Sequence, residues 1–186
     1  MAKDSLNDSI NSINPTDKKV LQIYIACLAA YNSSIAYGKW IDATQEIEAI
    51  HVEIQEMLFN SPIAGAKEFA VHAFDGFGPL RLDEYESVES IHEKARFILK
   101  HGELGAELLV YYGNVESAQD AIENRYHGEY KSQIDFAIQL FEDCHMESIP
   151  EMVQCYIDYA SFKRDIFLKD FFSLEVRDKT HVFAHG

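Results

Sequence analysis

The chain has 186 residues, 47% of them hydrophobic and 12% aromatic, and a formal net charge of −15 at pH 7. This length allows one domain or a few small ones with a sizeable core, and the apolar content excludes a disordered acidic tail. An anionic surface of this strength is repelled by DNA and by anionic membranes, so the composition favours a cationic partner.

The negative charge is concentrated in the centre of the sequence. Residues 42–160 hold 24 acidic and 7 basic side chains, whereas residues 1–41 and 161–186 each have a net charge of +1. A surface that is acidic only for solubility normally mixes the two signs. We therefore expect the central segment to carry the function.

Cysteine use and hydropathy indicate the compartment. The chain has three cysteines, and an odd number argues against a secreted disulfide framework. No apolar run reaches the ~18–20 residues of a membrane span, and the first residues lack the apolar core of a signal peptide. We expect a cytoplasmic protein that has no membrane partner.

An N-terminal α/β domain is predicted at residues 20–86, after a polar extension at residues 1–19 that we expect to be disordered. Its residue pattern indicates a small mixed sheet with one helix packed across it. The predicted elements are strands at 20–28, 36–41 and 68–75, and a helix at 44–59 capped by Asp42 or Thr44.

From Ser87 onward the apolar residues recur at helical spacing, which predicts a helical domain at 87–127 and a C-terminal α+β domain at 128–186. Ser87 and a Ser90-x-x-Glu93 box both indicate a helix start. The remaining helices are predicted at 103–112, 115–126, 129–145, 150–156 and 159–168, followed by a hairpin of strands at 171–176 and 180–184. The fold class is therefore α+β.

Carboxylates recur at helical spacing within these segments. Glu116, Asp120 and Glu123 fall at i, i+4 and i+7, and like charges so placed cost a helix a few tenths of a kcal/mol per pair. Helix stability therefore does not explain them, and we interpret them as a functional anionic surface. The full set of candidates is Asp42, Glu46, Glu53, Glu56, Glu86, Glu89, Glu93, Glu116, Asp120, Glu123, Glu129, Asp135, Glu142 and Asp143.

No catalytic or metal-binding pattern stands out. His51-x-Glu53 and His92-Glu93 lack the second ligand that a His-Glu-x-x-His motif would supply. The spacing of Cys144 and Cys155 matches no common metal site. We expect neither enzymatic activity nor a cofactor, although a small hydrolase that uses His51 or His72 stays open as an alternative.

A series of collinear segments runs from about Ile23 to His185. They are residues 24–32, 38–43, 61–66, 69–72, 76–80, 84–87, 108–113, 121–126, 156–159, 164–165 and 181–185. Together they resemble the ArdA-type antirestriction proteins. The stretch around Leu108 to Tyr126 resembles the antirestriction motif of that family, carried here by Leu108, Leu109, Tyr111, Tyr112, Gly113, Ala118, Ala121, Glu123 and Tyr126.

The resemblance implies an elongated three-domain protein that dimerises and mimics B-form DNA. Such a protein occupies the DNA-binding cleft in the methyltransferase core of type I restriction–modification enzymes, formed by the specificity and modification subunits. It thereby protects mobile DNA during horizontal transfer, binds no nucleic acid itself and needs no cofactor. The alternative from another class is an acidic adaptor that binds a basic protein without imitating duplex geometry.

Overall fold

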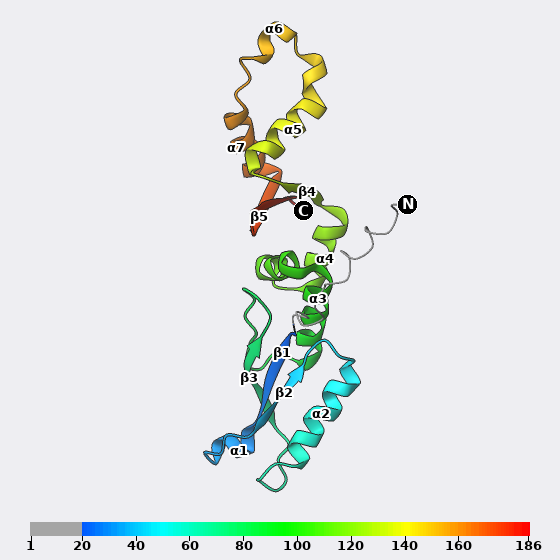
Figure 1. Ribbon diagram of the computed structural model, residues 1–186, viewed down its shortest axis with the longest axis vertical. Helices are drawn as coiled ribbons and strands as arrows, with labels where there is room; N and C mark the ends of the chain where they lie inside the picture. Colours follow the sequence, from blue (N-terminus) through cyan, green and yellow to red (C-terminus); the bar gives the residue numbers. More distant parts are fainter. Residues whose placement is uncertain (1–19) are drawn as a thin grey trace, which may run out of the picture. The chain divides into compact units, whose positions relative to one another are not determined.

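The computed structural model describes residues 20–186, which form two compact units, residues 20–76 and Phe77–Gly186 (Figure 1). The extension expected at residues 1–19 lies outside the described residues. The first unit contains a three-stranded sheet and a helix, and the second contains helices and a second three-stranded sheet. The α+β class is thus confirmed, while the three-domain division remains a prediction.

The first unit is built on a sheet of order β2-β1-β3. Both strand pairs are antiparallel. The mixed sheet that we expected from the sequence is therefore wrong. The predicted strands and helix are present, and a short helix after β1 was not predicted. Their bounds are β1 Gln22–Cys27, α1 Leu28–Asn32, β2 Gly38–Asp42, α2 Ile47–Phe59 and β3 Phe69–Asp75.

The core of this unit lies between the central strand β1 and helix α2. Ile23 and Ile25 alternate along β1 and are fully buried, as side chains at i and i+2 share one face of a strand. Helix α2 buries Ile50, Ile54 and Met57. Helical spacing in the sequence predicts an apolar stripe of Ile47, Ile50, Ile54 and Leu58, but Leu58 is half-buried and Met57 is buried in its place.

The start of α2 differs from the prediction. Its N-cap is Glu46, which makes no side-chain cap hydrogen bond. Asp42 instead accepts hydrogen bonds from the backbone N–H and the hydroxyl of Thr44, at 2.8 and 2.7 Å. Asp42 and Thr44 therefore form an Asx turn that ends β2, because the short Asp side chain reaches the backbone two residues on.

The second unit begins with two helices, α3 (Val88–Tyr112) and α4 (Val115–Asn124). Ser87 caps α3 as predicted by accepting the N–H of Ser90 at 3.2 Å. The Ser90-x-x-Glu93 box is not a cap: it lies inside the helix, where the Ser90 hydroxyl donates to Glu86 at 2.5 Å. Gly102 has φ 64° and ψ −143°, which interrupts α3 where the sequence indicated a helix end.

The chain ends in a sheet of order β4-β6-β5 that packs with two helices. The predicted hairpin and the helices around it are confirmed. The bounds are β4 Tyr126–Tyr130, α5 Gln133–His145, η1 Met146–Ser148, α6 Glu151–Gln154, α7 Tyr159–Lys169, β5 Phe171–Val176 and β6 Lys179–Ala184.

Strand β4 corrects the sequence prediction for residues 126–132. We expected one helix to end at His127-Gly128 and the next to start at residue 129. Residues 126–130 instead pair with β6, for example Glu129 with His181, and α5 starts only after its Ser132 cap. The partner strand lies about fifty residues away in the sequence, so local periodicity does not reveal it.

The C-terminal core is aromatic. Phe136, Ala137, Ile166 and Val182 form its buried centre. Helices α5 and α7 lie side by side around this core (Figure 1). Helical spacing in the sequence predicts that Ile134, Ala137, Ile138 and Phe141 face inward on α5, and of these four only Ala137 is fully buried. Phe136 was missed, because α5 contacts both α7 and the sheet and therefore buries a second stripe.

Candidate functional site

Helix α4 presents the predicted acidic face to solvent. Ala118 and Ala121 on its opposite side are fully buried in the second unit, which leaves Glu116, Asp120 and Glu123 exposed. Asp120 forms an ion pair with Arg125 at 2.8 Å and accepts a hydrogen bond from Asn124. The Glu123 carboxylate accepts from the neutral amide of Gln119, and no cation of residues 20–186 forms an ion pair with it.

Helix α5 presents a second group of carboxylates. Asp135 lies in the first turn, where negative charge is favoured by the helix dipole, and it accepts the Ser132 hydroxyl at 2.5 Å. Glu142 and Asp143 are exposed in the last turns, where the same dipole disfavours negative charge. These two carboxylates therefore add nothing to the stability of α5.

In the first unit, one predicted surface carboxylate is engaged internally. Glu53 on α2 forms an ion pair with Lys39 at 2.6 Å and accepts the Gln45 amide at 2.7 Å. The hydrogen bond from Lys39, followed by that from Gln45, lowers the pKa of the Glu53 carboxyl below its ordinary value. Glu46, the N-cap of this helix, and Glu56 within it are exposed.

Glu86 before α3 is engaged more deeply. Its side chain is 12% exposed, that of its partner Lys94 is 14% exposed, and Ser90 donates a further hydrogen bond to it. Glu89 and Glu93 are exposed on α3. Glu86 precedes the helix and lies eight residues before Lys94, so the i, i+3 and i, i+4 spacing of helical ion pairs does not indicate this pair in the sequence.

The predicted acidic residues therefore divide by environment. Glu129 on β4 forms an ion pair with Lys179 on β6 at 3.3 Å. Within residues 20–186, the candidates that are exposed and for which no ion pair is seen are Glu46, Glu56, Glu93, Glu116, Glu123, Asp135, Glu142 and Asp143.

The segment from Leu108 to Tyr126 joins α3 and α4 to the C-terminal sheet. Leu108, Leu109, Ala118 and Ala121 are buried, and Gly113 ends α3 with φ 76°. Tyr111 stacks on Phe172 of β5, with ring centroids 4.4 Å apart. Most of these residues therefore serve packing, and Glu123 is the one of them that presents a charge to solvent.

Two aromatic contacts strengthen this junction. The guanidinium of Arg125 lies 5.1 Å from the ring centroid of Tyr112, a cation–π geometry. The Tyr126 hydroxyl lies 2.7 Å from Nδ1 of His181 on β6. Burial lowers the pKa of the His181 imidazole and raises that of the Tyr126 phenol, so both groups are neutral at pH 7.

Other kinds of site receive no support within the described residues. No group of three His, Cys, Asp or Glu side chains in residues 20–186 is placed to hold a metal ion. His72, considered above for a hydrolase, packs edge-on against Tyr31 with ring centroids 4.8 Å apart. None of the helices in this part of the chain is both long enough and apolar enough to cross a bilayer.

These features define an acidic α+β protein whose distinctive surface is a set of helical carboxylates. Comparison with known families places it more closely: residues 23–177 match the family described as Antirestriction protein (ArdA). The match covers most of the chain, so the chain belongs to the ArdA antirestriction family. A search of curated proteins found no match. The family consists of inhibitors rather than enzymes, and its members act on restriction–modification systems.

Proposed function

We propose that the chain inhibits type I restriction–modification enzymes by mimicking B-form DNA and occupying their DNA-binding cleft. Family membership supports inhibition of restriction, and the exposed carboxylates support mimicry. The observation that carries the proposal is that Glu116, Glu123, Glu142 and Asp143 are exposed and have no ion pair within the described residues. They are available to lysines and arginines that otherwise contact phosphates.

The spacing of these charges approaches that of DNA without equalling it. Carboxylates at i and i+4 are separated by about 6 Å along a helix, whereas phosphates recur about every 3.4 Å in each strand. One acidic helix face therefore supplies about half the charge density of one strand. Because Asp120 is paired with Arg125, α4 contributes less than its sequence indicates, and several elements must act together.

The net charge of the chain indicates how long a stretch of duplex DNA it can imitate. Duplex DNA carries one charge per about 1.7 Å of axis, so a net charge of −15 corresponds to about 25 Å of duplex. Two copies correspond to about 50 Å. Inhibition then depends on many weak contacts, and it should weaken gradually with salt because exposed charges are screened.

The proposal includes a homodimer. The second unit leaves large apolar side chains exposed, among them Met152 at 80%, Tyr156 at 82% and Leu168 at 72%. Exposed apolar side chains in such number favour association with another protein surface. Sedimentation at micromolar concentration should show a species of twice 21.3 kDa, and a monomer alone would overturn this part of the proposal.

The alternative is an acidic adaptor that binds a basic protein at a surface other than its DNA cleft. Competition separates the two. The purified chain is titrated into a type I methyltransferase core that holds a fluorescent duplex with its recognition site. A mimic releases the duplex, is itself displaced by excess duplex, and blocks both methylation and cleavage. A stable ternary complex with bound duplex would exclude the mimic and favour the adaptor.

A further inference from the structure

Helix α3 carries basic residues in a chain that is otherwise poor in them. Residues 42–160 contain 7 Lys and Arg, and Lys94, Arg96 and Lys100 all lie on this helix. Lys94 is engaged by Glu86, and Arg96 and Lys100 lie four residues apart on the same helix. Like charges at this spacing destabilise a helix slightly, so helix stability does not explain the pair Arg96 and Lys100.

A cavity of about 590 Å³ lies beside Arg96 and Lys100, between α3 and the start of α4. Its walls combine two kinds of side chain. The apolar ones are Phe97, Leu99 and Val115, and the polar or charged ones are His92, Glu93, Arg96, Lys100 and Gln119. Ligand cavities typically measure 300–1,000 Å³ and pair apolar walls with a few polar groups. The size and lining are those of a small-molecule site.

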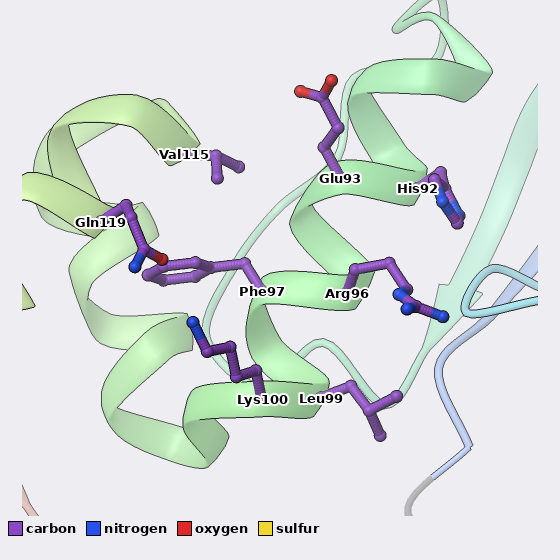
Figure 2. Close-up of a pocket in the computed structure, with 8 residues that line it drawn as sticks. All are labelled: His92, Glu93, Arg96, Phe97, Leu99, Lys100, Val115 and Gln119. Carbon is purple, nitrogen blue, oxygen red and sulfur yellow. The ribbon is translucent and has the colours of Figure 1, made fainter.

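The side chains are arranged for one anionic group at one end of the cavity. Figure 2 shows the Lys100 ammonium directed toward the space between the helices, next to the Phe97 ring and the Gln119 amide. Arg96 extends from the other side of α3, so its charge acts at longer range. The Glu93 carboxylate points away from Lys100, toward the N-terminal end of α3.

We propose that this cavity binds a small amphipathic anion, a carboxylate, sulfonate or phosphate carried by an aromatic or branched apolar body. Lys100 contacts the anionic group, and Phe97 and Val115 contact the apolar body, while the Gln119 amide stays bonded to Glu123. Arg96 offsets part of the negative field of the rest of the molecule, which would otherwise repel an anion. This binding is separate from mimicry and does not depend on it.

The probe is 8-anilinonaphthalene-1-sulfonate, whose aromatic body and single sulfonate fit the proposed chemistry. Fluorescence titration of the full chain should show one saturable site. Lys100→Gln should weaken binding about tenfold, the loss of one charge-assisted hydrogen bond, and Arg96→Gln about threefold. Lys131→Gln is the matched control, since Lys131 is exposed in the same unit and its removal changes the net charge equally.

Amide chemical shifts locate the probe independently. The perturbed amides should cluster in residues 92–100 and 115–119, and circular dichroism should show that all three variants are folded. Perturbation centred elsewhere, or equal weakening by Lys131→Gln and Lys100→Gln, would overturn the site. Restriction inhibition by Lys100→Gln should match that of the unmodified chain, so failure of this site is distinguishable from failure of mimicry.

Discussion

Helices α2 and α4 carry the same sequence pattern with different outcomes. Each places carboxylates on one face at helical spacing. On α2, Glu53 is held by Lys39 of the neighbouring strand β2 and by Gln45. On α4, Glu116 and Glu123 stay exposed and their charges are not compensated within the described residues.

The difference shows that spacing alone does not make a carboxylate available to a partner. Lys39 lies opposite Ile25 in the sheet, and its ammonium reaches Glu53 because β2 packs beside α2. Glu86 with Lys94 repeats the case on α3. A carboxylate that forms an ion pair within the chain is not available to bind a partner, and it stabilises the fold instead.

The largest expected effect comes from a substitution in the core that packs around the acidic helix α5, and not from a change of charge. Phe136→Ala should destabilise the second unit by about 3–5 kcal/mol, because it empties the centre of the C-terminal core beneath α5. Urea denaturation measures the loss, and inhibition should fall with it although every carboxylate is intact. Phe59→Ala is the control, since Phe59 is 90% exposed and its removal should leave stability unchanged.

Neutralising the exposed carboxylates tests whether they contribute to inhibition and not to stability. Glu116→Gln, Glu123→Gln, Glu142→Gln and Asp143→Asn combined should weaken inhibition about 100-fold without loss of stability, at about 1 kcal/mol or less per exposed charge. Inhibition constants at two salt concentrations measure this. The charge-matched control changes Glu147, Glu151, Asp170 and Asp178, which are exposed and outside the proposed surface. Equal weakening by both sets would show that net charge alone acts.

Glu86→Gln should have the opposite effect, a loss of stability without a loss of inhibition. It leaves the nearly buried Lys94 ammonium without its partner, which should cost about 2 kcal/mol of stability. Inhibition at temperatures where the variant is folded should be unchanged. Glu93→Gln on the same helix removes an exposed carboxylate and should leave the unfolding midpoint unchanged. Reduced inhibition by Glu86→Gln at unchanged stability would contradict the structural role of Glu86.

The smallest effect is a pH dependence specific to α2. Hydrogen bonding from Lys39 and Gln45 lowers the pKa of Glu53 from its ordinary 4.5. A lowered carboxyl pKa contributes stability that is present above pH 4.5 and is lost as the pH falls through the folded-state value. Glu53→Gln should therefore flatten the acid side of the stability profile below pH 4.5. Glu116→Gln, measured in the same buffers, should not.

The sequence by itself determined the features that arise within a few residues. Ser87 and Asn114 cap α3 and α4 through their own side chains, and Gly102 and Gly113 interrupt and end α3. These signals are local, because a cap or a left-handed residue acts on the nearest turn. Helical spacing likewise suffices to place Glu116 and Glu123 on one face, because residues seven apart are separated by about two full turns.

Tertiary structure decided which elements pair and which charges remain available. Strand β4 exists because β6 supplies its hydrogen bonds, and Phe136 is buried because α5 contacts a helix and a sheet together. Lys39 reaches Glu53 only through the packing of β2 beside α2. Such partners lie many residues apart in the chain. A local sequence pattern therefore does not indicate that they form a contact or how much the contact stabilises the fold.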